Sequence, residues 1–325
     1  MVVVVVSVMM WPAEGRHLDD ASRRPVSLAY HGGPLLTSPS LILHLFWYGS
    51  FSASQQAAIM DFISSFQAGS SSPAAGASTV ASWWKGVSLY TDASHARAST
   101  LLKLGSTASN PSCSFGKGLT RAQISQLLED SISTGLLPQH TNTDVIYIVF
   151  TSSDVVVESF CMSSCGYHSS VMSGQLPFIW VGNAERQCLG LCAWPFAVPQ
   201  YGPRGRKALV PPSGDAATDG MIINLATLLA GAVTNPFGQG YFPDAVDANT
   251  MYTNGSSAPA ARGNVEAATA CAGMFGKDSY PGFPGTLLLD ATSGAAYNAY
   301  GFNQRRFLLP ALWSPTTTKC QPPPS

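Results

Sequence analysis

The chain has 325 residues, of which 46% are hydrophobic and only 11% are charged, so it can bury a large core and is not a disordered protein. Its 17 Lys and Arg residues against 18 Asp and Glu residues give a formal net charge of -1, which excludes an electrostatic nucleic-acid binder because such a protein needs a basic face. The 30 Gly and 23 Pro residues indicate many turns and ordered loops. No long linker divides the chain, so we expect one large domain.

The amino-terminal segment, residues 1–25, resembles a secretory signal followed by a flexible stretch. Residues 2–11 are mostly apolar, a length that fits a signal core of roughly 7–15 residues but not a membrane span of roughly 20. No Lys or Arg precedes this run, and a buried Val-rich strand is the alternative. We therefore assign residues 1–25 as a signal-like or flexible segment and residues 26–325 as the folded domain.

Strands and helices alternate in the first half of the chain. Residues 41–48 (LILHLFWY) form an almost continuous apolar run, which predicts a strand buried on both faces. Helices are expected from a Ser54 cap to Phe66, and from a Thr120 cap to Gly135, because apolar residues recur there at helical spacing. The remaining predicted elements are a short helix over residues 80–87, buried strands over 144–150 and 176–181, and short late strands over 287–289, 307–309 and 312–313.

Residues 215–237 predict a helix in the middle of the core. No charged residue occurs between Gly220 and Pro243, and apolar residues lie on nearly every side of the helix. We expect Asp215, Thr218 or Asp219 to cap its start. With about 15 residues it is too short to cross a bilayer, so no stable membrane span is expected.

The seven cysteines favour disulfides and an oxidising compartment. Two C-x3-C pairs in Ser/Gly/Pro-rich surroundings differ from zinc ribbons, which prefer C-x2-C. Six paired residues and a free Cys113 is the simplest count. Connectivity cannot be deduced from sequence, but proximity favours a Cys271–Cys320 bridge and a two-bridge cluster of Cys161, Cys165, Cys188 and Cys192.

Standard catalytic motifs are absent. The chain has no H-E-x-x-H, no G-x-S-x-G, no phosphate-binding P-loop and no C-x-x-C, and its six His residues are scattered singly. We expect no cofactor and no metal. A carboxylate pair for glycoside hydrolysis stays open, because the separation of two carboxylates is a tertiary property. The candidates are Glu158, Glu185 and Glu266, or Asp154 and Asp290.

Nine sequence blocks carry a resemblance to a known family. They are residues 30–36 (YHGGPLL), 46–49 (FWYG), 82–84 (SWW), 161–168 (CMSSCGYH), 180–183 (WVGN), 192–196 (CAWPF), 219–226 (DGMIINLA), 233–238 (VTNPFG) and 309–313 (LPALW). In this order they resemble the plant EXORDIUM, or phosphate-induced, protein family. This resemblance implies a secreted protein of the apoplast or cell wall, linked to brassinosteroid-responsive growth and cell expansion, with no established enzymatic activity. The N-glycosylation sequon at Asn254 is compatible with the secretory route.

Residues 219–236 are also similar, more distantly, to the zinc-binding helix of secreted zincin-like metallopeptidases. In that register Thr227 stands for the metal-binding His, Leu228 for the general-base Glu and Gly231 for a second ligand. None of the three replacements restores that chemistry, so the resemblance implies a peptidase-like scaffold without catalytic groups. The expected fold is α+β: a single, disulfide-stapled, zincin-like domain with a mixed sheet and a central buried helix.

Two functions follow as alternatives. The first is a noncatalytic extracellular protein that binds a cell-wall glycan or a protein partner, with Trp83, Trp84 and His168 as binding candidates because exposed Trp rings stack on sugars. The second is an extracellular hydrolase acting on wall polysaccharide or peptide. Of the other Trp residues, we expect Trp180 and Trp313 in the core and Trp194 against a disulfide.

Overall fold

The computed structural model describes residues 26–67, 77–162, 164–199, 207–244, 265–280 and 282–323. The signal-like segment 1–25 and the sequon at Asn254 lie outside these residues.

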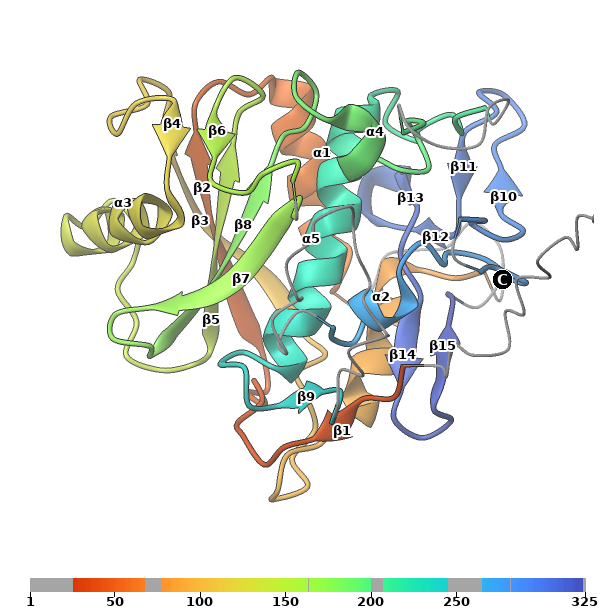
Figure 1. The fold of residues 1–325 in the computed structure, drawn as a ribbon, viewed down its shortest axis with the longest axis horizontal. Helices are drawn as coiled ribbons and strands as arrows, with labels where there is room; N and C mark the ends of the chain where they lie inside the picture. The colour runs from red at the N-terminus through yellow and green to blue at the C-terminus, as the bar shows by residue number, and fades with distance from the viewer. Residues whose placement is uncertain are drawn as a thin grey trace, which may run out of the picture.

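A five-stranded mixed sheet forms the centre of the molecule (Figure 1). Its strand order is β3-β2-β5-β8-β7, with β2, β3, β5 and β8 parallel and β7 antiparallel to β8. The strands are β2 (Leu41–Tyr48), β3 (Leu102–Asn110), β5 (Val145–Thr151), β7 (Gly166–Val171) and β8 (Leu176–Gly182). The prediction of an α+β protein with a mixed sheet is confirmed.

The central strands are buried on both faces, which explains their continuous apolar sequences. In β2, Leu43, Leu45 and Trp47 belong to one hydrophobic core, whereas Phe46 and Tyr48 belong to the other. This alternation follows from the two-residue period of a strand. Each core therefore needs its own covering layer.

Helices cover the two faces. In Figure 1, α3 (Arg121–Ser133) lies on one side of the sheet, and α1 (Ala53–Ser64) and α5 (Ala216–Thr234) lie on the other. The short helices α2 (Val80–Trp84) and α4 (Leu189–Cys192) flank α5. Single 3-10 turns cover Lys85–Leu89, Thr269–Cys271 and Phe302–Gln304.

The α5 helix is the central buried helix expected from the sequence. It has 19 residues, and among the described helices it alone is long and apolar enough to cross a membrane, but 78% of its most apolar window is buried inside the fold. The sequence predicts a helix of about 15 residues, which is shorter than the helix observed. Burial, rather than length, therefore identifies α5 as a core helix. Asp215 caps its start by accepting hydrogen bonds from the backbone N–H groups of Ala217 and Thr218.

The carboxyl-terminal third packs beside α5 as small antiparallel pairs (Figure 1). The pairs there are β10 (Leu288–Leu289) with β11 (Ala296–Tyr297), β12 (Ala299–Tyr300) with β13 (Arg306–Phe307), and β14 (Leu312–Ser314) with β15 (Lys319–Gln321). Earlier segments add β1 (Ala29–Tyr30) with β9 (Tyr241–Phe242), and the parallel pair β4 (Gly118–Leu119) with β6 (Val156–Val157).

Three disulfides connect the cysteines. Cys161 bonds Cys188 and Cys165 bonds Cys192, so the two C-x3-C pairs cross-link each other, and Cys271 bonds Cys320. Cys113 is free and buried. The bridges join the segment before β7 to both ends of α4, and the Thr269–Cys271 turn to β15.

Helix boundaries differ from the expectation at two places. The first helix is capped by Ser52 rather than Ser54, because Ser52 and Gln55 form a reciprocal capping box. The helix expected over 80–87 changes to a 3-10 turn after Trp84.

Candidate functional site

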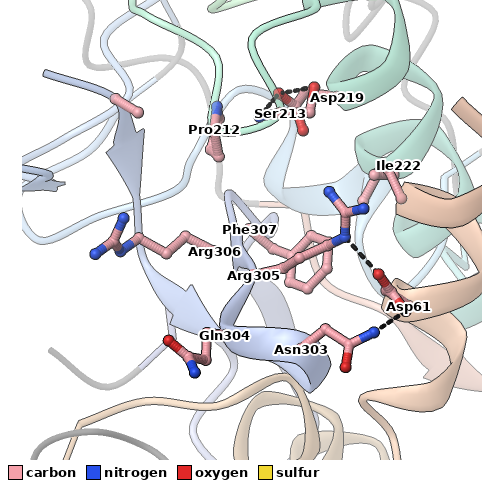
Figure 2. A pocket seen from close by; sticks show the side chains of 12 residues that line it. Asp61, Pro212, Ser213, Asp219, Ile222, Asn303, Gln304, Arg305, Arg306 and Phe307 are labelled. Atoms are coloured by element: carbon pink, nitrogen blue, oxygen red, sulfur yellow. Dashed lines mark hydrogen bonds and ion pairs between the residues drawn. The ribbon is translucent and has the colours of Figure 1, made fainter. Parts of the chain in front are cut away.

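Polar side chains gather at both ends of the apolar α5 helix. At its amino-terminal end lies a cavity of about 340 Å³ between α1, α5 and the carboxyl-terminal third (Figure 2). The cavity is lined by Ala58, Asp61, Pro212, Ser213, Asp219, Ile222, Ala295, Asn303, Gln304, Arg305, Arg306 and Phe307.

Arg305 and Asp61 form an ion pair on the wall of this cavity. Arg305 Nε donates to Asp61 Oδ2 at 2.6 Å, and Asn303 Nδ2 donates to Asp61 Oδ1 at 2.9 Å. Both Asp61 oxygens are therefore satisfied. The turn that carries Asn303 and Gln304 has left-handed backbone at both residues, with φ of 53° and 58°, a conformation that non-glycine residues adopt rarely.

Arg306 points to the opposite side from Arg305 in Figure 2. Its Nη1 group binds Asp290 Oδ2 at 2.7 Å, and its guanidinium lies over the Tyr297 ring. Arg305 therefore pairs with Asp61 on the cavity wall, whereas Arg306 pairs with Asp290.

Asp219 is a nearly buried carboxyl group in the same cavity. It is 4% exposed, and its Oδ2 accepts hydrogen bonds from the Ser213 backbone N–H and hydroxyl, both at 2.8 Å. Burial raises the pKa of Asp219 to about 7, against the opposing effect of the Ser213 hydrogen bonds. The group therefore gains or loses its proton near neutral pH.

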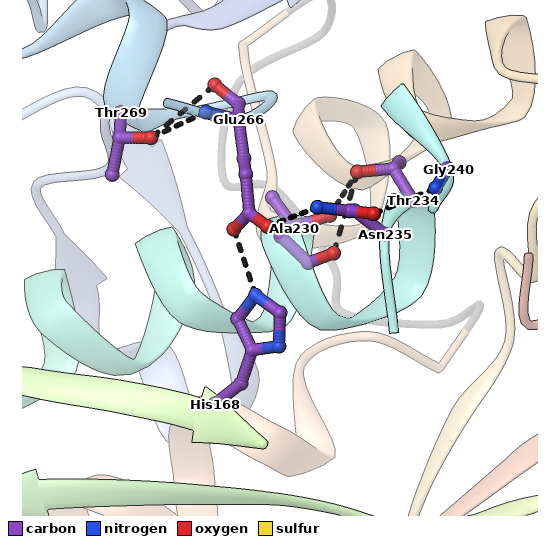
Figure 3. A network of polar contacts seen from close by, with 8 residues as sticks. His168, Ala230, Thr234, Asn235, Gly240, Glu266 and Thr269 are labelled. Carbon is purple, nitrogen blue, oxygen red and sulfur yellow. Dashed lines mark hydrogen bonds and ion pairs between the residues drawn. The ribbon is translucent and has the colours of Figure 1, made fainter. Parts of the chain in front are cut away.

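A buried ion pair occupies the opposite end of α5 (Figure 3). His168 on β7 donates from Nε2 to Glu266 Oε2 at 2.8 Å, and Asn235, the C-cap residue of α5, donates from Nδ2 to Glu266 Oε1 at 2.7 Å. Asn235 Oδ1 in turn accepts from the Gly240 backbone N–H. Glu266 therefore joins the edge strand to the end of the central helix.

The pair controls the charge of His168. Burial by itself would lower the pKa of His168, but the Glu266 charge and hydrogen bond outweigh burial and raise it. The second ring nitrogen, Nδ1, is buried and has no hydrogen-bond partner within the described residues.

Gly231 makes room for this carboxylate. A Cβ atom at position 231 would collide with Glu266 Oε2 and would lie 3.2 Å from His168 Nε2. The other two positions that correspond to zinc-binding chemistry are also occupied by packing or local bonding: Thr227 Oγ1 donates to the Ile223 carbonyl, and Leu228 packs against Gly166 of β7.

These residues do not fit a catalytic zinc ion. A hydroxyl engaged with its own helix, a Leu side chain and a Gly supply no zinc ligand or general base. Among the described residues, no three His, Cys, Asp or Glu side chains are grouped so that they could hold a metal ion.

The expectation that Trp83 and Trp84 are exposed binding residues is wrong. They are 3% and 0% exposed, and their indole N–H groups donate to the carbonyls of Pro310 and Ser99. Trp83 and Trp313 are among the residues that line a second cavity of about 300 Å³. His168 is also removed from the surface, with a side-chain exposure of 12%.

Of the other tryptophans with a predicted position, two lie in the interior, and Trp194 is partly buried. Trp180 and Trp313 are buried in the core, as predicted. Trp194 packs against the Phe275 ring, with 5.8 Å between ring centroids.

The carboxylates considered for hydrolysis lie in separate local contacts. Glu158 accepts from the Arg121 backbone N–H, Asp154 pairs with Lys117, and Asp290 pairs with Arg306. Glu185 lies exposed after Asn183, and Glu266 is in the buried pair with His168. The cavity instead contains Asp61 and Asp219, which no sequence spacing pairs because they come from different helices.

Comparisons with known proteins agree with the sequence blocks. The region described as "Phosphate-induced protein 1 conserved region" matches residues 28–323. The chain belongs to the phosphate-induced protein 1 family. Family members include Protein PHOSPHATE-INDUCED 1 of Nicotiana tabacum, 43% identical over 300 residues, which is 90% of this chain and 87% of the tobacco protein.

Relatives from Arabidopsis thaliana extend over the same region. Protein EXORDIUM is 43% identical over 302 residues, covering 90% of this chain and 88% of its own length, and Protein EXORDIUM-like 1 is 40% identical over 308 residues, covering 93% and 91%. No solved structure is significantly similar to this member of the phosphate-induced protein 1 family.

Proposed function

We propose that this protein is secreted to the plant cell wall, where it acts in brassinosteroid-responsive growth and cell expansion by binding a wall glycan or an extracellular protein rather than by catalysis. Its plant relatives named EXORDIUM and PHOSPHATE-INDUCED 1 support a growth-related role. Three disulfides suit an oxidising extracellular compartment.

The observation that carries the noncatalytic mode is the ion pair beside Gly231. The Glu266 carboxylate lies where any side chain at position 231 would project, and its two oxygens are bound by His168 and Asn235. A metal-activated water has no ligand set at this face of α5. The face therefore stabilises the fold instead of activating a nucleophile.

The scaffold in this proposal is a zincin-like domain whose catalytic positions have become packing positions. Support comes from the mixed sheet and from the contact of α5 with β8 and with the antiparallel edge strand β7. Thr227, Leu228 and Gly231 then keep their places on the helix without their former chemistry.

An extracellular hydrolase is the second candidate, and the cavity in Figure 2 is the observation that favours it. Asp219 has a pKa of about 7 in a cavity that also contains Asp61. A protonated and an ionised carboxyl group are the two parts that glycoside hydrolysis requires.

Metal content and turnover, measured on the purified secreted protein, distinguish the two candidates. We expect no stoichiometric zinc, binding to a wall fraction, and no release of soluble product from wall polysaccharide or peptide. Roughly one tightly bound zinc per chain, lost together with a hydrolytic activity, would contradict the proposal. Product release that survives Leu228→Glu but disappears in Asp219→Asn would instead establish a carboxylate-dependent hydrolase.

Localisation is a separate measurement. A fluorescent fusion expressed in plant tissue should remain at the wall after plasmolysis, and retention inside the cell would contradict the extracellular part of the proposal.

A further inference from the structure

We propose that the cavity at the amino-terminal end of α5 binds a uronic acid residue of an acidic polysaccharide, with Arg305 as the anchor for the sugar carboxylate. This inference deepens the proposed function and rests on it, because it names the ligand class of a wall-binding protein. The cavity volume of about 340 Å³ lies within the range of roughly 300–1,000 Å³ for small-ligand sites.

Arg305 has donors to spare. Its Nε is used by Asp61, but no described residue forms a hydrogen bond with its two terminal NH2 groups. The guanidinium is held in place from one side and is half-buried, with 31% side-chain exposure. A fixed guanidinium with free terminal groups is suited to bind a carboxylate through paired hydrogen bonds.

The other polar lining groups match hydroxyls. Gln304 carries an amide that can both donate and accept, as a sugar hydroxyl does, and the Ser213 hydroxyl, which donates to Asp219, can still accept. Apolar atoms of Ala58, Ile222 and Phe307 line the same cavity and supply surface for the C–H face of a ring. A site that binds a small acid through charge alone needs neither groups that match hydroxyls nor an apolar surface for a sugar ring.

The charges favour an anion at acidic pH. Arg306 is paired with Asp290, so the charged groups left to face a ligand are Arg305, Asp61 and Asp219, and Asp215 and Arg305 also act on Asp219. Below the Asp219 pKa of about 7 the charges of Arg305 and Asp61 cancel, whereas above it an ionised Asp219 adds a negative charge that repels a second carboxylate. At a pH below this pKa Asp219 is neutral and can donate a hydrogen bond, while a uronic acid is still ionised.

The test is a binding titration with three matched probes. An oligomer of galacturonic acid is compared with its fully methyl-esterified form, which keeps the backbone and removes the charge, and with polyglutamate of equal charge. We expect binding of the galacturonic acid oligomer at pH 5.5, at least about tenfold weaker binding of the ester, as for loss of a charge-assisted paired contact, and no comparable binding of polyglutamate. Equal binding of the ester or of polyglutamate would overturn the inference.

Variants connect the binding to the cavity. The double variant Asp61→Asn/Arg305→Gln removes the anchor without leaving an unpaired carboxylate, and should reduce affinity by at least about tenfold. Arg186→Gln removes an exposed charge elsewhere and should not change affinity. Thermal melts verify that each variant folds.

Asp219→Asn tests the pH dependence. The wild-type affinity should fall between pH 6 and pH 8, and in this variant the fall should be absent because the amide side chain carries no charge at either pH. A wild-type affinity that is flat over this range, or equal affinity of the double variant and the wild type, would overturn the inference.

The two proposals can fail separately. Binding to another wall component without turnover would overturn the uronic acid site and leave the noncatalytic function in place. Cleavage of the galacturonic acid oligomer, abolished by Asp219→Asn, would overturn the noncatalytic function and support the assignment of the site.

Discussion

His168 and Glu266 carry opposite charges in a place that water scarcely reaches, with side-chain exposures of 12% and 7%. Removing two charges from water is costly, and their attraction repays this only when the remaining hydrogen bonds are also made. Asn235 satisfies the second Glu266 oxygen by donating to it, so the carboxylate has a partner at both oxygens. The pair is therefore held in one geometry, and loss of one partner leaves a buried charge.

A pH-dependent stability follows from this pair. Because the folded-state pKa of His168 is raised above its ordinary value, the stabilisation is fully present below about pH 6.5, the pKa in the unfolded chain, and is lost as pH rises through the folded-state value. We expect His168→Gln to reduce the free energy of unfolding by about 3–5 kcal/mol at pH 6. Urea unfolding of both proteins over a series of pH values measures this difference, which should shrink at alkaline pH.

The control for this experiment is His95→Gln, because His95 is exposed. It should leave the stability nearly unchanged at every pH. A difference between wild type and His168→Gln that stays constant from pH 6 to pH 9 would show that the ion pair does not contribute.

The sequence indicated only part of this site. Gly231 was identified by resemblance, His168 as a binding candidate and Glu266 as a candidate carboxylate, but nothing paired Glu266 with His168, which is 98 residues away in the chain. No local spacing connects a strand residue with a loop residue so far along the sequence. Only the structure explains why position 231 is a glycine: the Glu266 carboxylate occupies the space that a side chain at this position would need.

At the scale of elements, α5 combines an apolar body with polar ends. Asp215 closes its start, and Asn235 ends it by leaving helical backbone geometry. Its apolar side chains pack in the core between the sheet and the carboxyl-terminal third. Capping matters here because the first backbone N–H groups of a buried helix have few other partners.

Asp215→Ala should reduce the free energy of unfolding by about 1–2 kcal/mol. The substitution removes the acceptor for the Ala217 and Thr218 N–H groups and for the Thr218 hydroxyl. Chemical denaturation measures the loss. Asp215→Ser keeps an acceptor and should recover most of the stability; equal destabilisation by Ala and Ser would contradict the capping role.

Apolar runs predicted β2, β5 and β8 well because these strands are central. Such runs did not predict β3 and β7, which are the edge strands of the sheet. Only Leu102 of β3 and Val171 of β7 are fully buried, so neither strand has the sequence of a buried strand. Edge strands are specified by their neighbours more than by their own composition.

At the scale of the whole molecule, three disulfides fasten the periphery to the core. Two of them hold the segment before β7 against α4, and the third ties β15 to the turn at Cys271. A cross-link stabilises mainly by restricting the unfolded chain, by roughly 2–4 kcal/mol for each bridge.

Reduction should therefore lower the melting temperature markedly. We expect a large drop in strong reductant, and the double variant Cys271→Ser/Cys320→Ser should reproduce part of it without reductant. Differential scanning calorimetry measures both. Cys113→Ser is the matched control, because Cys113 forms no bridge, and its drop in reductant should equal that of the wild type. An unchanged melt in reductant would refute structural bridges.

The fold class was predictable because strand and helix patterns are local, whereas the cavity was not. Its walls come from α1, the start of α5 and residues 303–307, which the sequence separates widely. Asp219 was expected to be a helix cap, and the pattern gave no sign that it lines a cavity. The burial of Trp83 and Trp84 was missed for a related reason. Their indole N–H groups donate to backbone carbonyls that only the tertiary structure brings close.

The side-by-side alignment of β2, β5 and β8 in one direction has a consequence for biosynthesis. Parallel strands cannot be joined by a tight turn. Each strand can pair only after the connecting segment has been synthesised and has folded back across the sheet. During that interval the nascent chain exposes apolar strand sequences that are prone to aggregate. Producing the protein in quantity therefore calls for slow synthesis in a host compartment that offers both chaperones and oxidants.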